Sequence, residues 1–114
     1  MKSEKTIQKE ILNYLEFLCR NRRLYYYRSN SGQFSFTRAD GSKGFMKTGR
    51  VGCPDITVLL PGGRFVGVEV KTKKGSLSPF QKKTAELIEE LGGVYLLVRS
   101  VEELKENLES LVSV

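Results

Sequence analysis

The chain has 114 residues, which suffices for one domain, 1–114, with a single modest core. Its formal net charge is +6, from nineteen Lys and Arg against thirteen Asp and Glu, and this balance favours polyanionic partners, nucleic acid first. The sequence contains no histidine, which excludes histidine general-base catalysis, Ser-His-Asp triads and the usual zinc sites.

The cysteines and the chain ends carry little further signal. Cys19 and Cys53 lack Cys-x-x-Cys spacing, so we expect idle thiols in a reducing cytosol. The first residues lack an apolar signal region, and no apolar run approaches membrane-spanning length. We therefore expect a cytoplasmic protein with no membrane partner.

The first predicted element is a helix of about sixteen residues with Ser3 as its N-cap. Glu4 falls inside the apolar stripe of this helix, and Glu10 lies near the edge of the stripe. An acid on an inward face needs a partner, whereas a first-turn glutamate can stay solvated and be favoured by the helix dipole. Spacing alone leaves both interpretations of Glu4 open. The stripe consists of Ile7, Ile11, Tyr14, Leu15 and Leu18.

A basic, glycine-rich region follows a short predicted strand at Leu24–Arg28. Aromatic segments on both sides of Ala39–Ser42 predict a hairpin insert over about 33–48. Cations interleaved with aromatics suit an arm that follows nucleic-acid phosphates, although a dimer contact or a solvated loop also fits. The candidate nucleic-acid-binding residues of the whole chain are Arg28, Asn30, Ser31, Arg38, Lys43, Lys47, Arg50, Lys73 and Lys74.

The central stretch predicts two strands with alternating apolar residues around the turn 61–63. This turn places Asp55 directly opposite Glu69, at a Cβ separation of about 5 Å. Two carboxylates at that distance repel unless a cation or a shared proton lies between them, and Lys71 on the same face offsets only part of the charge. A surface salt-bridge ladder is the alternative. We predict a divalent metal site, and without histidine its oxygen ligands point to Mg²⁺ or Mn²⁺.

The last third predicts a helix, a strand and a helix. Ser78 and Gln81 form a capping box, with Pro79 at the first helical position. Val94–Val98 is predicted to lie parallel to the strand containing Glu69, and Ser100 caps a final helix. The fold class is α/β, with a mixed central sheet flanked by helices in the order αβ-(hairpin insert)-ββαβα. The packing face of the helix after Ser78 is expected to consist of Phe80, Thr84, Leu87, Ile88 and Leu91.

The arrangement Pro54-Asp55 followed by Glu69-Val70-Lys71 resembles the PD-(D/E)xK nuclease superfamily. The chain as a whole is similar to the VRR-NUC (virus-type replication-repair nuclease) family in its small stand-alone form. Cys53 departs from the small or aliphatic residue usual at its position, and the insert lies outside the similarity. The other matching segments are Glu4 with Ile7-Gln8, Asn30–Gly32, Gly52–Asp55, Gly67–Lys71, and Leu77-Ser78 with Gln81.

The resemblance implies roles for individual residues. Asp55 and Glu69 would bind the metal, together with the backbone carbonyl of Val70. Lys71 would orient the nucleophile or stabilise the phosphate oxygens. Glu4 would be the helix acid that orients the attacking water, with Glu10 as the alternative. Gln81 would support Lys71 or the substrate.

The resemblance also implies an activity. We expect a Mg²⁺- or Mn²⁺-dependent endodeoxyribonuclease that acts on branched DNA in replication or repair, similar to Holliday-junction resolvases. A homodimer would place two active sites on opposed strands. No small-molecule cofactor is expected, and the origin would be bacterial, phage or viral. The alternatives are a DNA-binding module that keeps the fold without useful cleavage, and a flap or exonuclease-type activity.

Overall fold

The computed structural model describes residues 1–29, 33–47 and 50–112. Its first helix begins where the sequence predicts, because the Ser3 side chain accepts a hydrogen bond from the Thr6 backbone N–H. The elements in chain order are α1 (Glu4–Arg20), β1 (Tyr25–Arg28), β2 (Gln33–Thr37), β3 (Lys43–Lys47), β4 (Ile56–Leu60), β5 (Arg64–Val70), α2 (Pro79–Glu90), β6 (Val94–Val98) and α3 (Val101–Val112).

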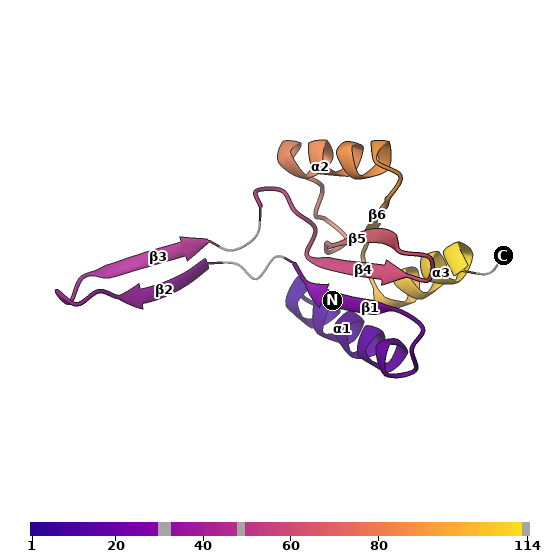
Figure 1. Cartoon of the computed structure of the whole chain (residues 1–114), viewed down its shortest axis with the longest axis horizontal. Helices are drawn as coiled ribbons and strands as arrows, with labels where there is room; N and C mark the ends of the chain where they lie inside the picture. The colour runs from indigo at the N-terminus through magenta and orange to yellow at the C-terminus, as the bar shows by residue number, and fades with distance from the viewer. Residues whose placement is uncertain (30–32, 48–49, 113–114) are drawn as a thin grey trace.

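Four strands form one mixed sheet in the order β1-β4-β5-β6 (Figure 1). β4 pairs antiparallel with both β1 and β5, whereas β5 and β6 are parallel. The parallel pair is connected through α2, as expected for a strand–helix–strand crossover. The structure therefore confirms the predicted α/β class and the mixed central sheet.

The inward face of the β4–β5 hairpin is wholly apolar and packs against α1 and α3. The alternation predicted for the central hairpin is confirmed, because its inward residues are all buried. Each fully buried aliphatic side chain of this kind contributes about 1.5–3 kcal/mol to stability. The core consists of Ile7, Ile11, Leu15, Ile56, Val58, Leu60, Val66, Val68, Val70, Val98, Leu104 and Leu108.

The opposite face of the sheet is much less covered, and α2 lies on this side (Figure 1). None of the twelve residues of α2, all of them described, is buried. Phe80, Leu87 and Leu91 are exposed, so the predicted packing face is wrong at these three positions. The helix reaches the sheet through half-buried Ile88, whereas its large apolar residues Phe80 and Leu87 face solvent within this chain.

β2 and β3 form the predicted hairpin as a separate two-stranded sheet (Figure 1). The guanidinium of Arg38 stacks on the ring of Phe36, 5.3 Å from its centroid, and donates a hydrogen bond to the Lys43 carbonyl. Gly44 allows this arrangement, because a Cβ there would lie 2.4 Å from the Phe36 ring. Asn30 and Ser31 lie outside the described residues, as does the side chain of Lys47.

Among the described residues, every helix is too short or too polar to cross a bilayer.

Candidate active site

The pairing of β4 with β5 brings the two predicted carboxylates together. Leu60 pairs with Arg64 and Ile56 with Val68, so the same register places Asp55 opposite Glu69. Both residues are buried, with relative exposures of 7% for Asp55 and 2% for Glu69. The predicted placement of Asp55 opposite Glu69 is therefore confirmed. An exposed salt-bridge ladder does not fit, because both carboxylates are buried.

Asp55 is fixed by backbone contacts from two neighbouring strands. Its Oδ2 accepts a hydrogen bond of 2.8 Å from the Val70 backbone N–H, so the Val70 peptide lies at the carboxylates. On the other side, the Ser29 N–H donates to the Asp55 carbonyl at 3.0 Å. The Ser29 hydroxyl also donates to the Pro54 carbonyl at 2.7 Å. The Pro-Asp step is thus held at the end of β1 before the chain enters β4.

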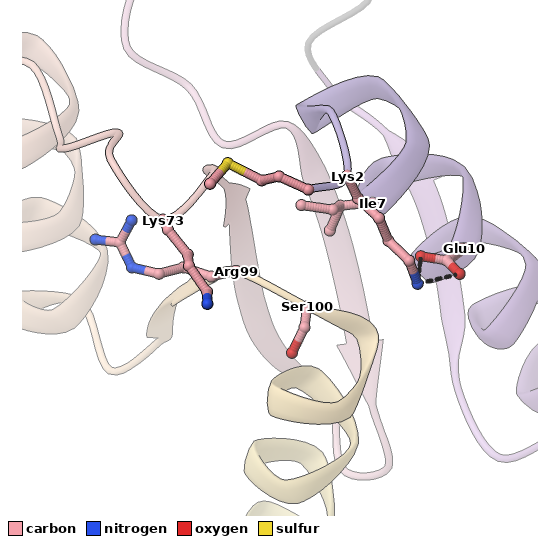
Figure 2. A pocket seen from close by; sticks show the side chains of 7 residues that line it. Lys2, Ile7, Glu10, Lys73, Arg99 and Ser100 are labelled. Carbon is pink, nitrogen blue, oxygen red and sulfur yellow. Dashed lines mark hydrogen bonds and ion pairs between the residues drawn. The ribbon is translucent and has the colours of Figure 1, made fainter.

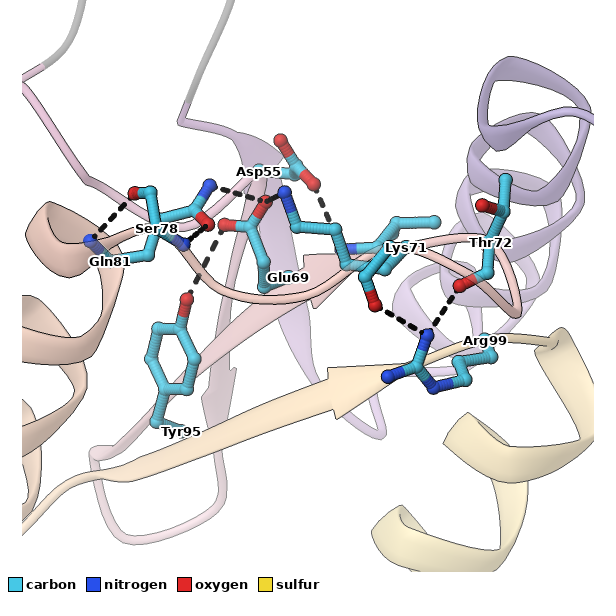
Figure 3. A network of polar contacts seen from close by, with 10 residues as sticks. Asp55, Glu69, Lys71, Thr72, Ser78, Gln81, Tyr95 and Arg99 are labelled. Atoms are coloured by element: carbon cyan, nitrogen blue, oxygen red, sulfur yellow. Dashed lines mark hydrogen bonds and ion pairs between the residues drawn. The ribbon is translucent and has the colours of Figure 1, made fainter.

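Glu69 is contacted by three side chains from three different segments (Figure 3). Gln81 Nε2 donates to Oε2 at 3.2 Å, and the Tyr95 hydroxyl donates to Oε1 at 3.4 Å. Lys71 Nζ lies 4.0 Å from Oε2. These donors compensate part of the cost of burying a carboxylate.

Gln81 forms the capping box predicted from the sequence, and its other contact is with Glu69, whereas the resemblance implied support of Lys71 or the substrate. Its Oε1 accepts a hydrogen bond from the Ser78 N–H at 2.8 Å and completes the capping box of α2. Its Nε2 is left free to donate to Glu69. The start of α2 and the buried carboxylate are therefore joined by one side chain.

Glycines bring α2 and Pro54 close to the site. A Cβ on Gly52, which has φ of +81°, would lie 2.7 Å from the Phe80 carbonyl oxygen. A Cβ on Gly67 would lie 2.6 Å from Pro54 Cγ. Gly67 thus leaves room for Pro54 beside the carboxylates, because any larger residue at position 67 would displace the Pro54 ring.

Lys71 follows directly after the end of β5. Its backbone N–H donates to the Val98 carbonyl at 3.0 Å, which extends the pairing of β5 with β6. The next turn is held by Arg99, whose Nη1 donates to the carbonyls of Thr72 and Gly75 (Figure 3). The side chain of Lys71 is half-buried and directed along this fixed turn toward Glu69.

The electrostatics of the pair are those of two acids sharing one site. Burial, the charge of Asp55 and the hydrogen bond with Asp55 raise the pKa of Glu69 from 4.5 to about 8, although Lys71 and Tyr95 oppose the change. Burial and the adjacent Glu69 also raise the pKa of the Tyr95 hydroxyl. Near neutral pH the pair therefore holds a proton that a cation could replace. Two convergent carboxylates supply hard oxygen ligands, which fit Mg²⁺ or Mn²⁺.

Both helix acids lie apart from the pair. Glu4 is exposed at the first position of α1, which fits the solvated first-turn interpretation. Both carboxylate oxygens of Glu10 accept hydrogen bonds from Lys2 Nζ, each at 2.9 Å. Within the described ranges, no three acidic, cysteine or histidine side chains form a metal-binding group. The sheet thus supplies Asp55 and Glu69, without a third carboxylate from α1.

The predicted nucleic-acid contacts fall into separate regions. Lys73 and Lys74 are exposed in the turn directly after Lys71, and Arg28 is exposed at the end of β1. Arg50 is exposed in the loop that leads to β4. Arg38 and Lys43 lie on the hairpin.

Three residues of the site were not predicted from the sequence, namely Ser29, Tyr95 and Arg99. Tyr95 pairs with Gly67 in the parallel register, which puts its ring on the face that carries Glu69. A tyrosine within an otherwise apolar strand is the available signal, because a buried hydroxyl needs a partner.

Replacing Tyr95 by phenylalanine should separate the support of Glu69 from the packing of β6. The ring and its packing remain, but Oε1 of Glu69 loses a buried donor. We expect metal affinity to fall by about tenfold or more, since a hydrogen-bond donor to an expected metal ligand is removed. Calorimetric titration of Mn²⁺ measures this change. Replacement of exposed Tyr25 by phenylalanine should leave the affinity unchanged.

Comparison with known proteins gives a consistent class. A solved structure described as a VRR_NUC domain shares the fold, with a TM-score of 0.62 and 21% sequence identity over 95% of this chain and 97% of the other. No curated protein matches the sequence. This likeness establishes the fold. The model of the VRR-NUC domain matches residues 2–102, and the chain therefore belongs to the VRR-NUC family of nucleases.

Proposed function

We propose that this protein is a Mg²⁺- or Mn²⁺-dependent endodeoxyribonuclease that cleaves branched DNA, in the manner of a Holliday-junction resolvase. The observation that carries the proposal is the buried Asp55–Glu69 pair on neighbouring strands, with Lys71 Nζ 4.0 Å from Glu69. The net charge of +6 suits a polyanionic substrate. Membership in a nuclease family supports phosphodiester hydrolysis as the reaction.

Each residue of the site has a defined part in this proposal. Asp55 and Glu69 would hold the ion, with the Val70 carbonyl as a further ligand. The bound ion would supply neutralisation of phosphate charge and a lowered pKa of water. Lys71, beside the carboxylates, would orient the attacking water and stabilise the negative oxygens of the transition state. In-line attack would leave a 5′-phosphate.

The third acid of the proposal is Glu4. It stands exposed on the first turn of α1, where DNA could bring a water molecule to it. Glu10 is already bound to Lys2 in an ion pair, which favours Glu4 for this role. We expect Glu4→Gln to lose more cleavage activity than Glu10→Gln. Equal losses would remove the preference.

The proposal is tested by incubating the purified protein with a four-way junction, a flap, a splayed arm and a linear duplex. We expect cleavage of the junction with Mg²⁺ or Mn²⁺, no cleavage with EDTA, and none by Asp55→Asn. Preferred cleavage of the flap or of duplex ends would instead favour a flap or exonuclease-type activity. Junction binding without cleavage in any metal would favour the DNA-binding module.

We propose that the protein acts as a homodimer. An exposed apolar row crosses the outer face of the sheet, because Tyr25 pairs with Leu59 and Leu59 with Phe65. Phe65 and Leu91 line a common cavity of about 190 Å³, which connects the row with α2. Exposed apolar patches of this kind mark interaction sites. No residue of the row carries a charge, so a second copy suits it better than DNA.

Replacing Leu91 by glutamate should weaken this dimer. Leu91 is 79% exposed, so the folded chain tolerates the change, whereas a dimer interface would have to bury two new charges. We expect the dissociation constant to rise at least about a hundredfold, measured by sedimentation velocity. Phe17→Glu, at a position 64% exposed on α1, is the matched control. A monomeric wild type, or equal weakening by both changes, would contradict the proposed surface.

A further inference from the structure

A separate cavity of about 450 Å³ lies between the start of α1, the turn after β5 and the junction of β6 with α3 (Figure 2). It is lined by Met1, Lys2, Ile7, Glu10, Lys73, Arg99 and Ser100. The carboxylates of Asp55 and Glu69 are not among these residues. The cavity is thus a neighbour of the candidate active site and not part of it.

The charged groups of the cavity lining are predominantly positive. Lys2, Lys73 and Arg99 contribute three cations against the single carboxylate of Glu10. That carboxylate is already bound by Lys2, which leaves Lys73 and Arg99 as the cations for a ligand. Ser100 closes the cavity at the start of α3, where its hydroxyl accepts from the Glu103 N–H.

Arg99 is fixed before any ligand arrives. Nη1 is hydrogen-bonded to the carbonyls of Thr72 and Gly75, which holds the guanidinium against the turn that carries Lys73. A guanidinium has five N–H donors, so donors remain for a ligand in the cavity. Cations that are held in place lose little conformational entropy on binding.

The cavity also lies at a useful distance from the site of cleavage. Lys73 follows Lys71 by two residues, so their Cα atoms are at most about 7 Å apart. One DNA strand rises about 3.4 Å per nucleotide, so a strand at Lys71 would present its phosphate at Lys73 within a few nucleotides.

We propose that this cavity binds a backbone phosphate of the DNA strand next to the scissile phosphate, through Lys73 and Arg99. The inference rests on the proposed function, because it names how the substrate strand is held beside that same site. The cavity sets the position of the strand, and the carboxylates act on the neighbouring phosphodiester.

The test compares Lys73→Ala with Lys73→Arg and with Lys9→Ala, which removes an exposed lysine of α1 outside the cavity. Binding of a four-way junction is measured in Ca²⁺ at several salt concentrations. We expect Lys73→Ala to lose about fivefold to tenfold in affinity and to reduce the salt slope by about 0.7–0.9, as for one phosphate contact. Lys73→Arg should restore both quantities, and Lys9→Ala should change neither.

A second measurement keeps the inference separate from cleavage. Titration with a 5′-phosphorylated dinucleotide, followed by amide NMR, should shift the signals of Lys73, Ser100 and Val101 in the wild type and not in Lys73→Ala. Loss of junction affinity in Lys73→Ala with these shifts supports the cavity, even if the protein cuts no DNA. Equal affinities of Lys73→Ala and Lys9→Ala, or a dinucleotide that shifts signals elsewhere, would overturn it.

Discussion

Replacing Lys71 by alanine is expected to reduce metal-dependent cleavage of a four-way junction by at least about a hundredfold, the usual loss when one stabilising donor of a transition state is removed. Lys71 Nζ lies 4.0 Å from Glu69 and is the cation nearest the carboxylates among the described contacts. The loss should appear in kcat, measured in single-turnover reactions with saturating Mg²⁺, because the ammonium group would act on the reacting phosphate.

Two further variants make this result specific. Lys71→Arg keeps the charge but not the compact ammonium group, so it should recover only part of the rate. Lys9→Ala removes a lysine from the exposed side of α1 and should cleave like the wild type. If Lys71→Ala cuts as fast as the wild type, the assigned mechanism is wrong. An equal loss in Lys9→Ala would mean that net charge alone is being measured.

The second large effect is expected from Glu69→Gln on the stability of the metal-free protein. Glu69 is 2% exposed and lies against Asp55, so its ionised form destabilises the folded state. A glutamine cannot ionise and keeps an oxygen that can accept from the Tyr95 hydroxyl. In EDTA at pH 8 we expect the variant to be more stable than the wild type by about 2–4 kcal/mol.

The sign of the pH dependence follows from the raised pKa. Glu69 has a pKa of about 8 in the folded chain against 4.5 ordinarily, so between these values the folded state binds more protons than the unfolded state. The contribution of Glu69 to the free energy of unfolding is therefore greatest below about pH 4.5. This contribution falls as the pH rises toward 8. Glu69→Gln should remove this fall. Thermal unfolding in EDTA at a series of pH values measures it.

Metal and an exposed acid provide the controls. Mg²⁺ should raise the melting temperature of the wild type at pH 8 and leave that of Glu69→Gln unchanged, because a ligand that binds only the folded state stabilises it. Glu90→Gln, on the exposed side of α2, should behave like the wild type throughout. A wild-type stability that is flat between pH 5 and pH 8 in EDTA would contradict the shared-proton description of the pair.

The central hairpin could be predicted because its geometry depends on short sequence distances. Alternation fixes which side chains share a face, and the turn 61–63 fixes the register, so Asp55 and Glu69 had to meet. The caps at Ser3 and Ser78 were predictable for the same reason, since each satisfies amides within three residues.

Contacts set by longer distances could not be predicted. Tyr95 reaches Glu69 only because β6 returns parallel to β5 after α2, with Gly67 paired to Tyr95. Periodicity correctly indicates an apolar stripe on α2, but it does not say whether the chain itself covers that stripe. Phe80, Leu87 and Leu91 are therefore exposed where burial was expected. Spacing likewise could not decide whether Glu4 has a buried partner or stays in solvent, and the structure leaves it exposed on the first turn of α1.

The two hydrogen bonds of Gln81 would link the proposed dimer to the proposed metal site. This one side chain caps the N-terminus of α2 and donates a hydrogen bond to Glu69, so the position of the helix affects the orientation of the Glu69 carboxylate. If a second subunit covers α2, dissociation of the dimer would weaken the hydrogen bond from Gln81 to Glu69. By reciprocity, metal binding would favour association of the subunits. Specific activity should then decline on dilution below the dimer dissociation constant, and added metal should shift that threshold to lower protein concentration.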